Sequence, residues 1–330
     1  MLKGKIVFEE HIAIEETLGR AKAFAGDSGH WEDFSKSILD IGEQRIELMD
    51  KNGIDFSILS NNSPGIQGLV DKEEAILISK KANDKMAEAV AKYPNRYGAF
   101  AALPMQDPDS ASMELTRCIK DLGFYGALVN SFTQKNIEKS AIYYDIPEYR
   151  SFWATVSELN VPFYLHPRMQ LESYAPIYDG HPWLKSAPWG FAVDTSIHAL
   201  RMCGSGMFED FPNLKIILGH LGEHIPYDLW RIDARMKFSP RGYRGNRPLG
   251  EYFLNNFLVT TSGNFNDPAF KCCLDVLGVD KIFFSTDYPF ENMEDACYWF
   301  DNTQVIDENE RLKIGRTNAI DLFNLNFLNE

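Results

Sequence analysis

The chain of 330 residues contains no stretch that approaches the ~18 consecutive apolar residues of a membrane-spanning helix. Its first residues, Met1–Lys5, lead directly into a strand-like segment, without the apolar segment and small-residue cleavage site of a secretory signal. We therefore expect a cytoplasmic protein that does not associate with membranes.

Cysteine and basic residues are also scarce. The cysteines are odd in number, irregularly spaced and embedded in apolar segments, which indicates buried free thiols rather than disulfides or a cysteine-metal site. They are Cys118, Cys203, Cys272, Cys273 and Cys297. The 33 Lys and Arg residues face 47 Asp and Glu residues, so the formal net charge is -14. Such a charge repels a phosphate backbone, and we expect no nucleic-acid partner.

A glycine-rich phosphate loop is absent after the first strand-like run, where residues 9–13 read Glu-Glu-His-Ile-Ala. An open doubly wound sheet that binds a dinucleotide would more often carry such a loop at this position. A dinucleotide site is therefore not expected. The composition, with 45% hydrophobic and 24% charged residues, is that of an ordinary globular protein.

Short apolar, β-branched runs recur along the whole chain, and longer amphipathic segments separate them. This alternation is typical of βα units and a mostly parallel sheet. The runs predict eight strands, at Lys5–Glu10, Phe56–Asn61, Tyr97–Leu103, Gly126–Asn130, Pro162–His166, Lys215–Gly219, Leu258–Ser262 and Lys281–Thr286. The segments between them predict helices, at Glu43–Lys51, Lys72–Tyr93, Pro108–Leu122, Pro147–Leu159, Thr195–Phe208, Pro268–Leu277 and Glu308–Leu322. Eight strands in alternation with helices favour an α/β fold of the closed (β/α)8 TIM-barrel type.

Two segments, residues 12–42 and 167–193, are longer than a minimal barrel requires. In barrels such insertions usually lie on the catalytic rim, where they form lids or subunit contacts. No linker-like change of composition interrupts the sequence. We therefore predict a single barrel domain over residues 1–330, with rim insertions.

Polar side chains follow several predicted strands at their ends, which is where a barrel places its catalytic groups. The first strand ends in Glu-Glu-His at residues 9–11, and the fifth ends in His166. The sixth is followed by His220 and Glu223, and the eighth by Asp287. Three histidines therefore share one predicted rim with acidic residues.

Side chains alternate between the two faces of a strand, so Glu9 and His11 point the same way and Glu10 points opposite. Together with His166 and Asp287, Glu9 and His11 provide two nitrogen and two oxygen ligands for one divalent metal ion. Imidazole and carboxylate together favour Zn or Mn over Mg. A single His at a strand end is more often a hydrogen-bonded structural residue, but the joint pattern favours a metal site.

The sequence His-Leu-Gly-Glu-His at residues 220–224 differs from the His-Glu-x-x-His zinc helix, because its Glu lies three residues after the first His. A zinc protease is not expected. Glu223 is placed to fix the tautomer and orientation of His220, which leaves the other ring nitrogen for a substrate proton or oxygen. A carboxylate at a helix start is an equally open interpretation of Glu223. His224 and the mid-helix His198 are interpreted as structural.

The chain resembles the decarboxylases of the amidohydrolase superfamily (the amidohydrolase 2 type). The likeness covers essentially the entire chain and rests on segments 5–11, 126–130, 161–168, 216–226, 260–265, 284–292 and 314–319. Fungal-type 2,3-dihydroxybenzoate and salicylate decarboxylases tend to have Glu-Glu-Ala where this chain has Glu-Glu-His. His11 therefore favours the branch that acts on 2,6-dihydroxybenzoate (γ-resorcylate).

This resemblance implies a carboxy-lyase of aromatic compound catabolism, expected to be a homotetramer. The implied reaction is the reversible, non-oxidative decarboxylation of 2,6-dihydroxybenzoate to resorcinol and CO2, with one divalent metal ion and no organic cofactor. By this resemblance, the metal ligands are Glu9, His11, His166 and Asp287, and the catalytic residues are Asp287, His220 and Glu223. The resemblance also places four residues around the substrate, namely Phe24, Asn130, Arg231 and Phe290.

Other functions stay open at this point. The substrate could be 2,3-dihydroxybenzoate or salicylate, or a metal-bound hydroxide could hydrolyse a lactone or amide on the same scaffold. A catalytically inactive barrel that serves as a binding module is the third alternative, which the four ligand-type residues at strand ends disfavour.

Overall fold

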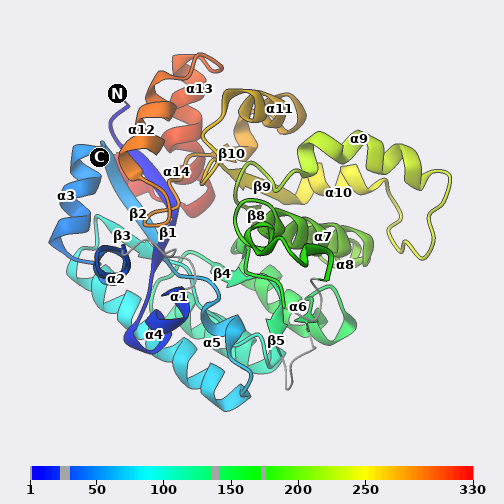
Figure 1. The fold of residues 1–330 in the computed structure, drawn as a ribbon, viewed down its shortest axis with the longest axis horizontal. Helices are drawn as coiled ribbons and strands as arrows, with labels where there is room; N and C mark the ends of the chain where they lie inside the picture. Colours follow the sequence, from blue (N-terminus) through cyan, green and yellow to red (C-terminus); the bar gives the residue numbers. More distant parts are fainter. Residues whose placement is uncertain (1, 23–29, 135–140, 172–175, 330) are drawn as a thin grey trace.

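The computed structural model describes residues 2–22, 30–134, 141–171 and 176–329. Parallel strands form its centre, in one sheet of order β1-β2-β3 and another of order β10-β9-β8-β7-β4 (Figure 1). Bridges between Glu10 and Tyr288 and between Ala101 and Ala127 join the two sheets at both edges. The strands therefore close into the (β/α)8 barrel that the sequence predicts. Their bounds are β1 Lys5–Ile12, β2 Ile54–Asn61, β3 Tyr97–Ala99, β4 Ala127–Asn130, β7 Phe163–His166, β8 Ile216–Leu218, β9 Phe257–Thr260 and β10 Ile282–Phe283.

Each of the eight predicted runs overlaps one of these strands, although two observed strands are much shorter than predicted. The run 97–103 is a strand only as far as Ala99, and the run 281–286 only as far as Phe283. Beyond these points the barrel continues through single contacts, such as the backbone N–H of Asp287 donating to the carbonyl of Glu9 at 3.0 Å. A small antiparallel pair of β5 (Thr133–Gln134) and β6 (Ala141–Ile142) lies outside the barrel order.

Helices surround the strands, and their caps follow the sequence closely. Asp71 and Asp107 accept from the backbone N–H of Glu74 and Ser110, and Asp307 forms a capping box with Glu310. The α-helices are α1 Glu15–Ala21, α2 Trp31–Leu39, α3 Glu43–Lys51, α4 Lys72–Lys92, α5 Pro108–Lys120, α6 Arg150–Leu159, α7 Gly190–Gly204, α8 Met207–Asp210, α9 Ile225–Met236, α10 Leu249–Asn256, α11 Asp267–Leu277, α12 Met293–Asn302, α13 Glu308–Leu312 and α14 Asn318–Phe323. Within the described residues no helix is both long and apolar enough to cross a membrane.

The predicted helix 308–322 is interrupted by a π-helical turn over Lys313–Thr317, and the predicted helix 195–208 divides into α7 and α8. Short 3-10 helices complete the connections, at Gly65–Gly68, Pro147–Tyr149, Pro176–Tyr178, Pro182–Lys185, Val279–Lys281 and Asn326–Asn329.

The barrel interior is filled by alternate side chains of the strands. Phe8, Phe100, Tyr164 and Phe283 belong to one buried cluster inside the strands, closed at one end by Phe323. A second, larger cluster packs between the strands and the helices. On β2, β4, β7 and β9 the next lumen-facing position toward the carboxyl end is polar, and this layer carries the site described below.

A β-bulge in β1 decides which residues enter that layer. Val7 pairs with Ser57 and Glu10 with Leu59, so β1 has one residue more than β2 in this interval. Strict alternation from Phe8, which faces the lumen, would turn Glu9 outward. The extra residue lets Phe8 and Glu9 both face the interior, which is a common use of bulges beside functional sites.

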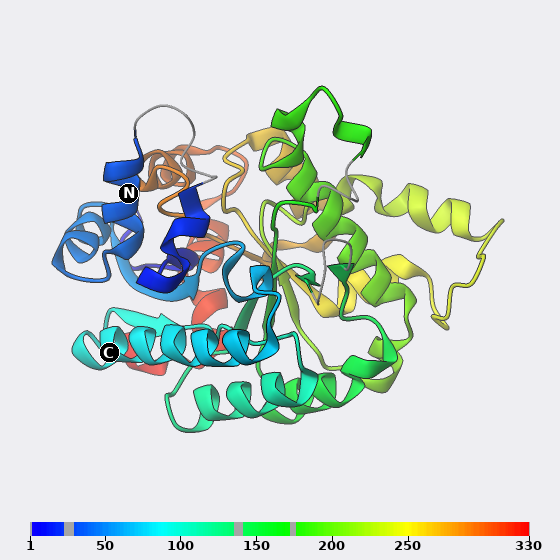
Figure 2. The ribbon, with the colours of Figure 1, turned by 60° about the horizontal axis from the view of Figure 1, so that its bottom comes forward.

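The described parts of the two predicted insertions lie at the rim. Residues 12–22 and 30–42 include α1 and α2, which enclose a small apolar cluster that includes Phe290. Part of residues 167–193, from Ser186 to Phe191, lines the cavity above the polar layer. Figure 2 shows the barrel turned by 60°, with α9 and α10 and the segment that connects them extending from its side.

Candidate metal centre

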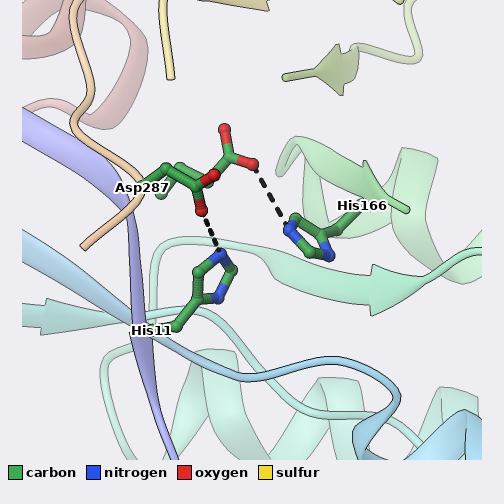
Figure 3. A group of neighbouring side chains, drawn as sticks. His11, His166 and Asp287 are labelled. Carbon is green, nitrogen blue, oxygen red and sulfur yellow. Dashed lines mark ion pairs between the residues drawn. The ribbon is translucent and has the colours of Figure 1, made fainter. Parts of the chain in front are cut away.

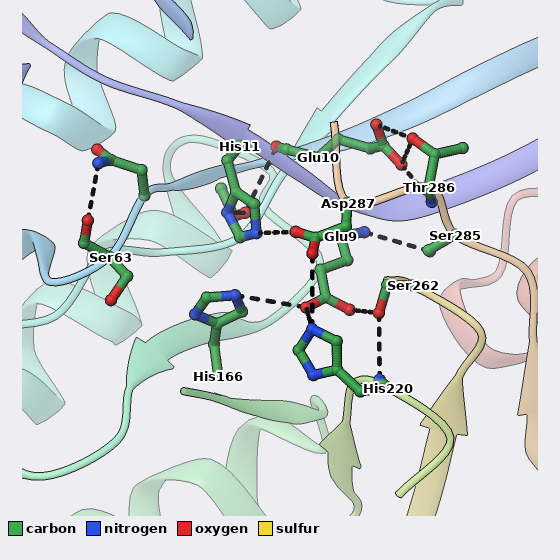
Figure 4. A network of polar contacts seen from close by, with 12 residues as sticks. Glu9, Glu10, His11, Ser63, His166, His220, Ser262, Ser285, Thr286 and Asp287 are labelled. Atoms are coloured by element: carbon green, nitrogen blue, oxygen red, sulfur yellow. Dashed lines mark hydrogen bonds and ion pairs between the residues drawn. The ribbon is translucent and has the colours of Figure 1, made fainter. Parts of the chain in front are cut away.

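Four buried side chains meet at the carboxyl ends of the strands. Glu9 and His11 come from β1, His166 ends β7, and Asp287 follows β10. One ligand atom from each lies within 4.8 Å of all the others, and all four residues are buried. His11 Nε2 lies 3.2 Å from Asp287 Oδ1, and His166 Nε2 lies 3.4 Å from Glu9 Oε1. Figure 3 shows the imidazole of His11 directed at Asp287, and Figure 4 shows that of His166 directed at Glu9.

The donor atoms fit a divalent cation. Glu9 Oε1, His11 Nε2 and Asp287 Oδ1 are buried and have no hydrogen-bond partner. Buried polar atoms are almost always satisfied, so three orphaned atoms directed at one point indicate that another group completes them. Two nitrogen and two carboxylate oxygen ligands suit Zn or Mn better than the all-oxygen sets that Mg prefers.

Hydrogen bonds at Nδ1, the ring nitrogen that faces away from the centre, orient the two imidazole ligands. His166 Nδ1 lies 2.8 Å from Asn130 Oδ1, and His11 Nδ1 lies 3.1 Å from Ser60 Oγ. Each ring therefore presents Nε2 to the centre, as is usual for metal-binding histidines. Asn130 Nδ2 donates to two backbone carbonyls, so all the polar atoms of this side chain are engaged. The structure thus places Asn130 behind His166, and the predicted substrate contact stays a prediction.

His220 and Glu223 form the pair that the spacing suggested. His220 Nδ1 lies 2.6 Å from Glu223 Oε1, and its Nε2 lies 3.5 Å from Asp287 Oδ2. All five residues from His220 to His224 adopt positive φ, with values from 51° to 81°. This left-handed stretch is costly for non-glycine residues, and within it Glu223 comes within hydrogen-bond distance of His220.

Burial and neighbouring charges shift several pKa values at the centre. Burial raises the pKa of Glu9 to about 8. Burial also lowers the pKa of His166 well below its ordinary value, which favours the neutral imidazole that binds metals. Burial alone would raise the pKa of Asp287, but the imidazoles of His11 and His220 outweigh it and hold that pKa below its usual value.

Two further groups have raised pKa values. Burial lowers the pKa of His220, but Glu223 and Glu9 act more strongly together and raise it well above its ordinary value. Glu10 is fully buried, and this raises its pKa to about 8. Glu10 accepts from the backbone and hydroxyl of Thr286, and Figure 4 shows it directed away from the four ligands, on the face that alternation predicts.

A cavity of about 360 Å³ opens above the centre. Its lining includes His166, His220, Asp287, Phe290 and Phe191. The ring of Phe290 also packs edge-on against His11, at 5.4 Å between centroids. A larger groove of about 820 Å³ lies between α7 and the segment that follows α9, and its described lining residues include none of the four ligands. Volume alone therefore does not identify the site.

Of the residues predicted around the substrate, Arg231 is not brought to the centre. Phe24 lies outside the described residues. Arg231 lies on α9 with an exposed side chain, and it is not among the described residues that line the cavity.

Sequence reasoning missed several residues of the site. Ser63 lines the cavity, and its buried hydroxyl has no hydrogen-bond partner. Tyr164 and Thr260 contact Glu9 from below. The signal for Tyr164 was its position two residues before His166 on the same strand, which places both side chains on one face.

Comparisons with known proteins agree with this geometry. A family profile described as amidohydrolase matches residues 42–325. The gamma-resorcylate decarboxylase of Rhizobium sp. (strain MTP-10005) is 50% identical over 328 residues, which cover 98% of this chain and 99% of the relative.

Two solved structures are similar over nearly their full lengths. A dihydroxybenzoic acid decarboxylase from Polaromonas sp. JS666, with bound manganese and the inhibitor 2-nitroresorcinol, has a TM-score of 0.96 and 50% identity, with 98% of each chain covered. A 2,6-dihydroxybenzoate decarboxylase in complex with 2,6-dihydroxybenzoate has a TM-score of 0.95 and 49% identity, covering 98% of this chain and 100% of that one.

Proposed function

This chain belongs to the amidohydrolase family, and we propose that it catalyses the non-oxidative decarboxylation of 2,6-dihydroxybenzoate to resorcinol and CO2. It is a carboxy-lyase that uses one divalent metal ion, either Zn or Mn. The observation that carries the proposal is the buried cluster of four ligand atoms within 4.8 Å, facing a cavity of a size suited to one aromatic ring.

Direct expulsion of CO2 would leave an aryl carbanion, so the reaction needs a proton on the carboxyl-bearing carbon first. Protonation there gives a dearomatised ring that releases CO2 and regains its aromaticity. Glu9, His11, His166 and Asp287 would hold a divalent cation, which would supply positive charge to balance the anionic oxygens of the substrate.

Asp287 is the proposed proton donor to the ring carbon. Its carboxylate lines the cavity, and its second oxygen lies 3.5 Å from His220 Nε2. The neighbouring imidazoles favour the ionised form of Asp287, whereas a bound substrate anion raises its pKa toward the protonated form. The bound substrate therefore favours the protonated form of Asp287, which is the form that can donate a proton to the ring carbon.

His220 is proposed to act on the phenol oxygen of the substrate: the cationic imidazole binds this oxygen as a hydrogen-bond donor, and the neutral imidazole takes its proton and later returns it. The Nδ1–H group of His220 donates to Glu223, which fixes the ring so that Nε2 faces the cavity. Phe290 is proposed to hold one face of the substrate ring. Phe24, Asn130 and Arg231 stay predicted as further contacts of the substrate.

A comparison of substrates tests the function directly. The protein is incubated with 2,6-dihydroxybenzoate, 2,3-dihydroxybenzoate and salicylate, with and without a chelator, while CO2 and phenolic product are measured. We expect resorcinol and CO2 in equal amounts, fastest turnover of the 2,6 isomer, and none with chelator. Consumption of lactones or amides without CO2 release would instead identify a hydrolase.

The Glu223→Gln variant tests the role of the pair. The amide still accepts a hydrogen bond from His220 but no longer stabilises its cationic form, so kcat should fall about 10²-fold. Metal content should stay unchanged, because Glu223 is not among the four ligands. An unaltered kcat, measured as initial rates of CO2 release, would show that Glu223 serves only the local fold.

We also propose that the enzyme is a cytoplasmic homotetramer built from a single domain. The five cysteines are free, which suits a reducing compartment. Tyr227 and Trp230 of α9 are each 81% exposed, and exposed aromatic residues of this kind mark subunit contacts. Sedimentation measures the assembly directly.

A further inference from the structure

The carboxylate of Glu9 is held from below by three hydroxyl groups. Tyr164 and Ser262 donate to Glu9 Oε2, and Thr260 Oγ1 donates to the same oxygen at 3.0 Å. All three residues are fully buried. A carboxylate that binds a cation is ionised, and an ionised oxygen is a stronger acceptor than a hydroxyl. We therefore assign the three protons to Glu9, although the hydroxyls also approach one another at 2.7–2.8 Å.

The second oxygen of Glu9 has opposite surroundings. Oε1 is buried, has no hydrogen-bond partner, and lies 3.4 Å from His166 Nε2. One oxygen is therefore saturated by donors and the other is free for a cation. Figure 4 shows Ser262 on one side of the Glu9 carboxylate and His166 on the other.

Gly219, directly after β8, leaves room for the Glu9 carboxylate. A Cβ at this position would lie 2.8 Å from Glu9 Oε1 and 2.9 Å from Oε2, closer than atoms pack. A glycine is thus required here for space. The residues that surround the Glu9 carboxylate therefore come from three neighbouring strands. Tyr164 lies on β7, Gly219 follows β8, Thr260 ends β9, and Ser262 follows β9.

A carboxylate can bind a metal through one oxygen or through both. We infer that Tyr164, Thr260 and Ser262 are positioning residues that hold Glu9 as a one-oxygen ligand and thereby set the affinity and coordination number of the cation. This inference rests on the proposed function, since it assumes that Glu9 binds the metal. It assigns a purpose to three hydroxyls that the reaction itself does not use.

The test compares Tyr164→Phe with Tyr97→Phe. Both phenols are buried on barrel strands, but the Tyr97 hydroxyl has no hydrogen-bond partner, so its removal is a matched control. The dissociation constant for Mn²⁺ is measured on the metal-stripped full-length protein. We expect it to rise 10- to 100-fold in Tyr164→Phe, as for other residues that orient ligands, and to stay unchanged in Tyr97→Phe.

Two further readouts separate positioning from general damage. With saturating Mn²⁺, kcat of Tyr164→Phe should recover to within a few-fold of the unmodified protein. In the Co²⁺-substituted protein, release of Oε2 raises the coordination number, and the visible absorption should weaken. Ser262→Ala and Thr260→Val remove the other donors with smaller changes of shape and should show the same two effects even if Tyr164→Phe folds poorly.

Wild-type Mn²⁺ affinity and Co²⁺ spectra in Ser262→Ala and Thr260→Val would overturn the inference. Failure of the unmodified protein to bind Mn²⁺ or Co²⁺ would instead contradict the proposed function. The two outcomes are therefore distinguishable.

Discussion

Replacement of Asp287 by asparagine abolishes CO2 formation from 2,6-dihydroxybenzoate, with an expected loss in kcat of at least ~10³-fold. The amide has nearly the same shape, and its oxygen can still face His11, but it has no acidic proton to give to the ring carbon. Substrate should still bind, because the rest of the centre and the cavity wall are unchanged. Resorcinol is quantified by chromatography and substrate binding by calorimetry.

The interpretation of this variant depends on its metal content, because Asp287 is also a proposed ligand. Elemental analysis of the purified Asp287→Asn protein separates loss of the acid from loss of the cation. A metal-loaded, substrate-binding and inactive protein supports the role of Asp287 as proton donor. Full residual turnover would remove Asp287 from the mechanism.

Removal of the divalent metal is expected to have an equally large effect. Dialysis against a chelator should abolish activity, and Zn²⁺ or Mn²⁺ should restore it, with Mg²⁺ less effective because two ligands are imidazoles. The metal binds only the folded chain, so its addition at about 100 times its Kd should stabilise the fold by about 2.7 kcal/mol. Activity, metal content and melting temperature are measured on the same samples.

Two histidine variants control this experiment. His166→Ala removes a ligand and should lose the metal together with activity. His198 is equally buried, but it lies on α7 and its Nε2 accepts from the backbone of Tyr144. His198→Ala should therefore keep the metal even where it lowers thermal stability. A protein that is fully active without any divalent ion would contradict the proposed centre.

The sequence predicted the barrel because its strands are short apolar runs at regular intervals, and the ends of these runs carry Glu9, His11, His166 and Asp287. The bulge in β1 was not predictable. It depends on how Phe8 and Glu9 pair with β2, and nothing local in the sequence marks the extra residue. Alternation gave the correct relation between Glu9 and His11, and the register with β2 is regular from Glu10 onward.

Other features depend on tertiary contacts that a sequence pattern does not contain. Tyr164 lies in an apolar strand and reads as a core residue, since both faces of a barrel strand are buried. Asn130 ends its strand as predicted, but only the packing shows that it bonds His166. The N-cap of α11 is Asn266, and Asp267, the residue before the predicted start at Pro268, accepts from Trp299 and Thr303.

The contact between β1 and the segment after β10 has a consequence for how the protein matures. Glu9 and Asp287 lie almost a full chain length apart, yet the backbone of Asp287 donates directly to that of Glu9. A ribosome delivers Glu9 early and Asp287 near the end of synthesis. A nascent chain therefore lacks Asp287, one of the four metal ligands, until translation is nearly complete. We expect the complete metal site to form only once the barrel has closed.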